Sequence, residues 1–165
     1  MKGFTLIEVI ITTAIIGLLS GIMFVNFRGV RESIGSRQSA QNIAQSIRVL
    51  QNRAFGGVCS ISPCRFGAHF DVSTTAFLIF EDRGATFNGQ YDMGEEIETV
   101  ALEENIVILS LSLSYACSAS LCADVLFGPP DPVISFKPAS AAGLTISITG
   151  GKSVTIGSGG SVDVN

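Results

Sequence analysis

The opening stretch MKGFTLIEVIITTAIIGLL places one carboxylate, Glu8, inside a run of apolar side chains, and seventeen uncharged residues follow from Val9 to Val25. A carboxylate in hydrocarbon costs about 3 kcal/mol or more unless a cation pairs with it, so its presence indicates a function. The segment itself contains no cation. A free α-amine at Phe4, created by cleavage after Gly3, would lie one helical turn from Glu8 and could pair with it within one chain or between neighbours. The alternative is that Glu8 reaches the headgroups at the membrane surface.

The cysteines are the second candidate for chemistry, because they form two equal C-x-x-x-x-C units. Four thiolates could hold zinc, although structural zinc units more often separate paired cysteines by about two residues. In an oxidising compartment disulfides are favoured, and each local bridge would stabilise the chain by about 2 kcal/mol. We expect the pairs Cys59–Cys64 and Cys117–Cys122, because the second bridge would close a hairpin between strands at 107–116 and 123–127.

An acidic loop is the third candidate. The stretch NGQYDMGEE (88–96) resembles half of a calcium loop, but the first and third positions of that pattern carry no carboxylate here. Calcium requires only clustered oxygens, so a weak site remains a hypothesis. Its ligands would be Asp82, Asn88, Asp92 and Glu95. The alternative is a solvated acidic loop that faces the arginines of a neighbouring molecule.

The single histidine, His69, lies between Phe66 and Phe70 on a predicted hairpin. With no second histidine in the chain, a structural role at a surface or half-buried position is the stronger interpretation. The sequence also contains no G-x-S-x-G, Walker or H-E-x-x-H motif. We therefore expect no enzyme activity and, apart from the weak calcium loop, no cofactor.

A long helix must position the first of these residues. Residues 4–55 contain no proline and predict one helix about 75 Å long, which should end at Gly56-Gly57. Residues 4–27 are long and apolar enough to span a bilayer, and a secretory signal is disfavoured because no cleavage site of small residues follows. Residues 28–55 are amphipathic, and their apolar stripe needs a sheet to cover it. The stripe consists of Val30, Ile34, Ile43, Ile47, Leu50 and Ala54.

Residues 56–165 predict β structure, since no helix-period run longer than about ten residues occurs there. A hairpin is predicted over 65–82 with its turn at 73–75, and one alternating strand over 107–116. Further strands are predicted in the stretches ADVLFG, DPVISFKP, GLTISIT, KSVTI and SVDVN. The economical arrangement is an α+β fold in which the long helix packs on an antiparallel sheet.

Charge is distributed unevenly along the chain, whose net charge is −4. The second half of the predicted helix is basic, whereas residues 81–104 are acidic, which favours association between opposite patches of neighbouring molecules. Few basic residues follow position 66, so a nucleic-acid partner is not expected. The basic residues there are Arg83, Lys137 and Lys152.

The contiguous stretch KGFTLIEV resembles the processing signal of type IV prepilins and of the pseudopilins of type II secretion. The resemblance implies that a prepilin peptidase cuts between Gly3 and Phe4 and that the amine of Phe4 is methylated. It also implies that Glu8 pairs with the N-terminal amine of an adjacent subunit during assembly. The expected divisions are a leader (1–3), a transmembrane and assembly helix (4–27), the amphipathic second half of that helix (28–55) and an extracytoplasmic β-rich domain (56–165).

The domain is also similar to the H-type minor pseudopilins and related minor pilins, through the block from FGAHFD to GEEI and the Gly-rich C-terminal strands. The resemblance implies a structural minor subunit of a type IV pilus or a type II secretion pseudopilus. The expected partners are other pilin subunits, the prepilin peptidase, membrane lipid and an inner-membrane assembly platform. The N-terminus would be cytoplasmic and the domain periplasmic or extracellular. A DNA-binding minor pilin for DNA uptake is the alternative, as is a membrane-anchored domain that does not polymerise.

Overall fold

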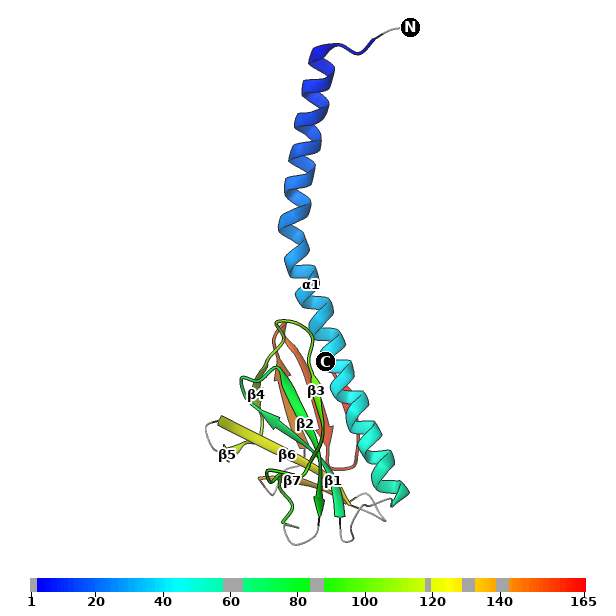
Figure 1. Cartoon of the computed structure of the whole chain (residues 1–165), viewed down its shortest axis with the longest axis vertical. Coiled ribbons are helices and arrows are strands. Elements are labelled where there is room, and N and C mark those ends of the chain that lie inside the picture. Colours follow the sequence, from blue (N-terminus) through cyan, green and yellow to red (C-terminus); the bar gives the residue numbers. More distant parts are fainter. Residues whose placement is uncertain (1–2, 58–63, 84–87, 118–119, 129–132, 139–142) are drawn as a thin grey trace.

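The computed structural model describes residues 3–57, 64–83, 88–117, 120–128, 133–138 and 143–165, with the backbone alone for 24–28 and 133. One helix, α1 (Leu6–Gly56), carries a β-rich domain on its second half, and its first half projects away from that domain (Figure 1). The predicted pilin-like α+β fold, with a long N-terminal helix on antiparallel sheets, is therefore confirmed.

The two ends of α1 follow from local sequence signals. Thr5 is the N-cap, with extended backbone angles. At the other end Gly57 has a φ of 60°, and its N–H donates to the Ala54 carbonyl oxygen at 3.2 Å. Glycine takes this left-handed conformation at little cost because it has no Cβ, so the helix ends at the predicted glycine pair.

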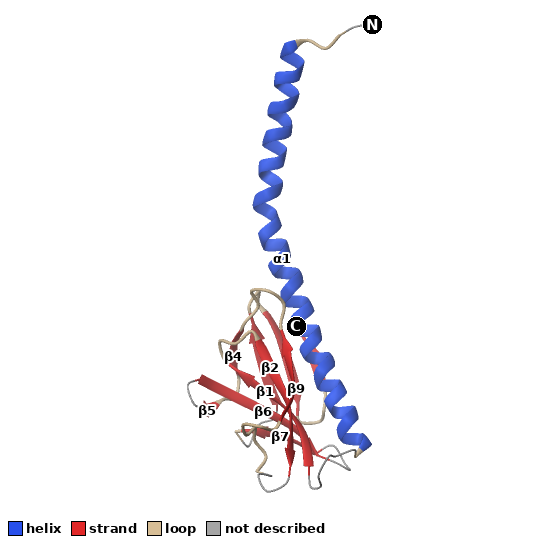
Figure 2. Ribbon diagram, viewed as in Figure 1, coloured by secondary structure: helices blue, strands red, loops and turns tan. Residues whose placement is uncertain are grey.

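The described strands form two antiparallel sheets (Figure 2). The six-stranded sheet has the order β3-β2-β1-β6-β5, and β7 also pairs with β6. The four-stranded sheet has the order β10-β9-β8-β4. The bounds are β1 (Cys64–Asp71), β2 (Ala76–Arg83), β3 (Glu96–Ala101), β4 (Ile108–Leu111), β5 (Tyr115–Cys117), β6 (Ser120–Gly128), β7 (Val133–Lys137), β8 (Gly143–Ile148), β9 (Lys152–Gly157) and β10 (Val162–Val164).

The core lies between the second half of α1 and strands of both sheets, β1, β6, β9 and β10. Ile43, Ile47 and Leu50 of the predicted stripe are fully buried, as is Ala54. The stripe is wrong at its beginning, because Val30 and Ile34 are 51% and 59% exposed. The domain first approaches the helix at about Gly35, near Glu103 and Ile106, so the preceding turns have no sheet over them.

Hydrogen bonds between distant residues fasten α1 to the domain. Gln51 donates from Nε2 to the Gly160 carbonyl at 2.9 Å, and Arg48 donates to the Val162 carbonyl at 3.3 Å. The Glu103 backbone N–H donates to Ser39 Oγ at 2.9 Å. These bonds tie α1 to the β9–β10 turn, to β10 and to the loop after β3, so the helix and the domain are held in one orientation.

Two features of the sheets differ from the prediction. The single strand expected at 107–116 is divided into β4 and β5, which lie in different sheets. A register shift between Ile108 and Ser110 breaks the predicted alternation, so Leu109 is 55% exposed whereas Leu111 is partly buried against the core. Strand β3 was not predicted at all, because its exposed, acidic residues carry no apolar alternation, and it forms only by pairing with β2.

Gly67 of β1 leaves room for a buried ring, and replacing it by alanine is expected to destabilise the domain by about 1–3 kcal/mol. A Cβ at this position would lie 2.5 Å from Phe80 Cζ and 3.1 Å from the Val125 carbonyl oxygen. The measurement is denaturant unfolding followed by tyrosine fluorescence. Gly159→Ala is the control, since a Cβ there meets no atom within 4 Å. Equal stabilities of the two variants would contradict the steric argument.

Candidate functional site

The N-terminal candidate site lies at the exposed tip of α1. Thr5 and Glu8 form a capping box: the Thr5 backbone N–H and its hydroxyl donate to Glu8 Oε2 at 3.0 and 2.9 Å, and the Glu8 N–H donates to Thr5 Oγ1 at 3.4 Å. Phe4, just before the cap, is 89% exposed. Within the isolated chain, therefore, Glu8 closes its own helix end and does not contact the domain.

The helix that follows is apolar on every side. Leu6–Met23 is long and apolar enough to cross a membrane, and none of that segment is buried. Its polar side chains are satisfied locally: Thr12 Oγ1 donates to the Glu8 carbonyl at 2.9 Å, and Thr13 Oγ1 donates to the Val9 carbonyl at 2.9 Å. Glu8 is thus the only charged side chain in a surface otherwise suited to lipid or to other apolar helices.

The cysteine units occupy opposite ends of β1. Cys117 and Cys122 form the predicted disulfide, with a Cα–Cα distance of 6.0 Å across the β5–β6 hairpin. Cys64 is disulfide-bonded too, while Cys59, its predicted partner, lies outside the described residues. Cys122 is paired with Asp71, seven residues along β1 from Cys64. At about 3.3 Å per residue that separation is roughly 23 Å, which excludes a four-thiolate zinc site.

A polar cluster that we did not predict lies inside the six-stranded sheet around His69, which is buried rather than half-exposed. His69 Nδ1 lies 2.6 Å from Asp124 Oδ1, and its Nε2 lies 3.3 Å from Asp71 Oδ2. Asp124, which is 0% exposed, also accepts hydrogen bonds from the Tyr115 hydroxyl and from the Tyr91 backbone N–H. The cluster joins β1, β5, β6 and the loop before β3.

Burial and nearby negative charge shift the pKa of His69 in opposite directions. Burial alone would lower the pKa of His69, but the hydrogen bond and negative charge of Asp124, together with Asp71, outweigh it and raise that pKa above its usual value. Burial and the bond to Asp124 both raise the pKa of Tyr115, so its hydroxyl remains a donor. The Tyr91 ring covers His69 at a centroid distance of 4.7 Å.

One signal in the sequence could have located this cluster. Asp124 interrupts the apolar stretch ADVLF, and an acid inside a buried strand requires a partner. The partner, however, is 55 residues away in the sequence, so the pairing of β1 with β6 is needed to identify it.

The predicted calcium residues are brought into one loop, where they bond mainly to the loop itself. Asp82 is fully buried and accepts the N–H groups of Asn88 and Gly89 at 3.3 and 2.8 Å. Asn88 Nδ2 donates to Asp92 Oδ2 at 2.7 Å, and Glu95 Oε2 accepts the Asp92 N–H at 3.1 Å. Burial raises the pKa of Asp82 above its usual value. Calcium binding at this loop stays a prediction.

Comparison with known proteins bears on the N-terminal site. Residues 1–24 match the family model described as the prokaryotic N-terminal methylation motif. This motif marks the type IV prepilin and pseudopilin family, and the match includes Gly3, Phe4 and Glu8. No curated protein and no solved structure matches the chain. The comparison supports the broad resemblance and does not extend to the H-type subfamily.

Proposed function

We propose that this chain, which carries the mark of the type IV prepilin and pseudopilin family, is a minor structural subunit of a type IV pilus or a type II secretion pseudopilus. The observation that carries the proposal is the fully exposed apolar half of α1, continuous with a helix that is packed into a folded domain. Such a helix is insoluble on its own, so it requires lipid before assembly and neighbouring helices afterwards.

The apolar surface is available around the whole helix. Exposed fractions of its large side chains range from 51% at Val9 and Ile15 to 81% at Leu6. In a filament these side chains would pack against the corresponding helices of other subunits. The other large apolar side chains exposed on this half of α1 are Ile7, Ile10, Ile11, Ile16, Leu18, Leu19, Ile22 and Met23. The rigid connection through α1 would then place the domain on the outside of the helical bundle.

Cleavage between Gly3 and Phe4 would create the cation that Glu8 lacks. The new amine lies next to the capping box, in which Glu8 Oε2 takes both donors from Thr5. A carboxylate offers about four acceptor positions, so the box leaves capacity for an ammonium group of a neighbouring subunit. Inside an apolar bundle the ion pair is less costly than either charge alone. Glu8 would therefore favour the position of a neighbouring subunit at which its N-terminal amine meets this carboxylate.

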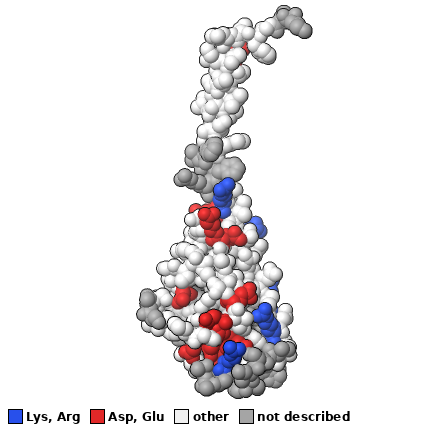
Figure 3. Space-filling model, in the orientation of Figure 1, with Lys and Arg blue, Asp and Glu red and all other residues white. Residues whose placement is uncertain are grey.

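The processing, the assembly partners and the localisation of the chain follow from the same proposed role. The chain would be processed by a prepilin peptidase and handed to an inner-membrane assembly platform, with its N-terminus cytoplasmic and its domain periplasmic or extracellular. On the face seen in Figure 3, acidic side chains form several patches on the domain, and basic side chains lie beside and between them. This distribution favours contacts between subunits over the alternative of a DNA-binding minor pilin.

The N-terminus of the protein recovered from its host tests the proposal directly. Mass analysis of the intact chain and of its first peptide should show a start at Phe4, with a methyl group on the amine. The same analysis of a Gly3→Leu variant should show an unprocessed start, because a bulky side chain obstructs the cleavage position. A wild-type chain that keeps Met1, Lys2 and Gly3 in a host with active prepilin peptidase would rule the proposal out.

A further inference from the structure

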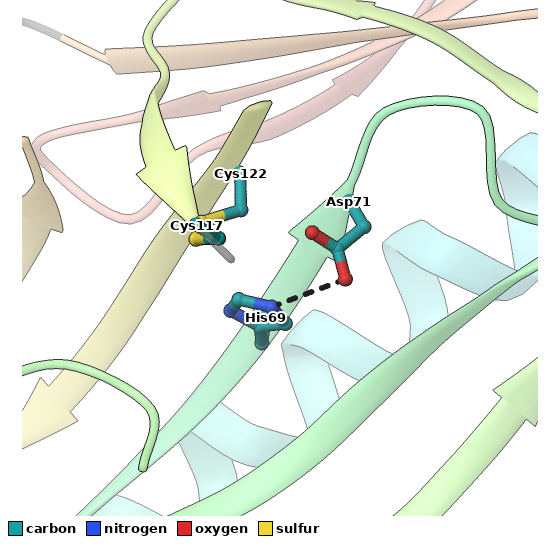
Figure 4. Close-up of side chains that lie close together, drawn as sticks. All are labelled: His69, Asp71, Cys117 and Cys122. Atoms are coloured by element: carbon teal, nitrogen blue, oxygen red, sulfur yellow. Dashed lines mark ion pairs between the residues drawn. A yellow bond between two sulfur atoms is a disulfide. The ribbon is translucent and has the colours of Figure 1, made fainter. Parts of the chain in front are cut away.

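Four side chains that suit a thiophilic metal converge at one end of β1. His69 and Asp71 come from β1, Cys117 from β5 and Cys122 from β6 (Figure 4). Their ligand atoms all lie within 4.8 Å of one another. The register explains this, because Cys122 is paired with Asp71 on one side and with Tyr115 on the other, which brings the Cys117–Cys122 bridge to the end of β1.

The two proposed ligands on β1, His69 and Asp71, are each held by a hydrogen bond to a further side chain, as metal-binding side chains usually are. Asp124 binds Nδ1 of His69, which leaves Nε2 to face the Asp71 carboxylate at 3.3 Å. Asp71 in turn uses Oδ2 toward His69 and accepts the Ser120 hydroxyl on Oδ1 at 2.8 Å. A carboxylate behind a histidine fixes the ring and its tautomer and raises its basicity as a ligand. The cluster therefore contains the proposed ligands and also the side chains, Asp124 and Ser120, that hydrogen-bond to them.

We propose that the reduced chain binds one Zn²⁺ ion through the Cys117 and Cys122 thiolates, His69 Nε2 and Asp71, and that the disulfide and the metal are alternative states of this site. Two sulfurs, one imidazole nitrogen and one carboxylate oxygen form a tetrahedral set that zinc accepts. The inference concerns the domain alone and does not depend on the proposed role in a filament.

The change between the two states is balanced by a dithiol or phosphine reductant. Two electrons and two protons convert the Cys117–Cys122 disulfide into two thiols. A dithiol reductant becomes a disulfide in return, whereas a phosphine takes an oxygen atom from water and becomes a phosphine oxide. Zinc binding then releases the two thiol protons and forms two S–Zn bonds. Reoxidation by a disulfide oxidant, which takes up two electrons and two protons and becomes two thiols, would release Zn²⁺, because sulfurs bonded to each other cannot act as thiolate ligands.

The test uses the full chain in detergent, in the Cys59→Ser/Cys64→Ser variant, so that the proposed site holds the only thiols. After phosphine reduction, Co²⁺ serves as a spectroscopic substitute for zinc. We expect one Co²⁺ per chain, with the visible and charge-transfer bands of tetrahedral thiolate coordination, and displacement of Co²⁺ by Zn²⁺. The oxidised chain should bind none. Failure of the reduced chain to bind metal stoichiometrically would overturn the proposal.

Variants of the cluster separate ligands from positioning residues. Cys117→Ser/Cys122→Ser, which retains Cys59 and Cys64, should lose the charge-transfer band. Asp124→Asn should keep the band but weaken affinity by about 10–100-fold, as loss of an outer-shell partner does. Asp163→Asn, at an exposed position of β10, is the matched control and should bind normally. Circular dichroism checks that each variant is folded. Unchanged binding in the Cys117→Ser/Cys122→Ser variant would also overturn the proposal.

Discussion

Replacing Glu8 by alanine is expected to leave the chain in the membrane and to reduce its incorporation into the filament by more than about tenfold. The apolar segment around Glu8 remains, so insertion should not change. In the bundle, however, the neighbour's amine would lose its partner, and an unpaired buried charge costs about 3–5 kcal/mol, whereas about 1.4 kcal/mol already corresponds to a factor of ten. The measurement is the ratio of filament-bound to membrane-bound chain, obtained by shearing and immunoblotting.

Two further variants separate the charge of Glu8 from its role in the capping box. Glu8→Gln keeps a side chain that can complete the box with Thr5 but removes the charge. Thr5→Ala removes the box and keeps the charge. If the ion pair drives assembly, Glu8→Gln should resemble Glu8→Ala, and Thr5→Ala should have a smaller effect. Normal incorporation of Glu8→Gln would show that helix capping, not pairing with an amine, is the function of this carboxylate.

Replacing Asp124 by alanine is expected to lower the free energy of unfolding of the domain by about 3–5 kcal/mol. The carboxylate is fully buried and is shared by His69, the Tyr115 hydroxyl and the Tyr91 N–H. Alanine would remove all three acceptor contacts at once and leave buried donors unsatisfied, each of which costs about 1–3 kcal/mol. Both tyrosines of the chain lie in this cluster, so tyrosine fluorescence during denaturation reports directly on it.

The oxidised chain in a chelating buffer is the material for this comparison, so that neither thiols nor metal contribute. Asp124→Asn should lose less stability than Asp124→Ala, because its amide oxygen can still accept one of the hydrogen bonds. The free energy of unfolding of Asp163→Ala, at an exposed position of β10, should lie within about 0.5 kcal/mol of that of the wild type. A loss below about 1 kcal/mol for Asp124→Ala would mean that the cluster contributes little to holding β1, β5 and β6 together.

Local signals account for much of what could be predicted. The apolar segment with Glu8, the absence of proline up to residue 55 and the glycine pair after it were sufficient for the long helix and its end. The hairpin of β1 and β2 follows from two short apolar runs joined by a short polar turn. The disulfide between Cys117 and Cys122 follows from the hairpin between them. In each case the residues that determine the feature lie within a few positions of one another.

Contacts between distant residues decided the rest. Strand β3 exists because β2 offers an edge, and the stretch 107–116 divides because its two ends pair with different sheets. His69, Asp71 and Asp124 meet the Cys117–Cys122 bridge only after β6 pairs with β1. Buried polar side chains carry no period of their own, since their position is set by a partner many residues away. The N-terminal site is therefore a prediction that the sequence alone can make, whereas the cluster in the domain could be recognised only from the tertiary structure.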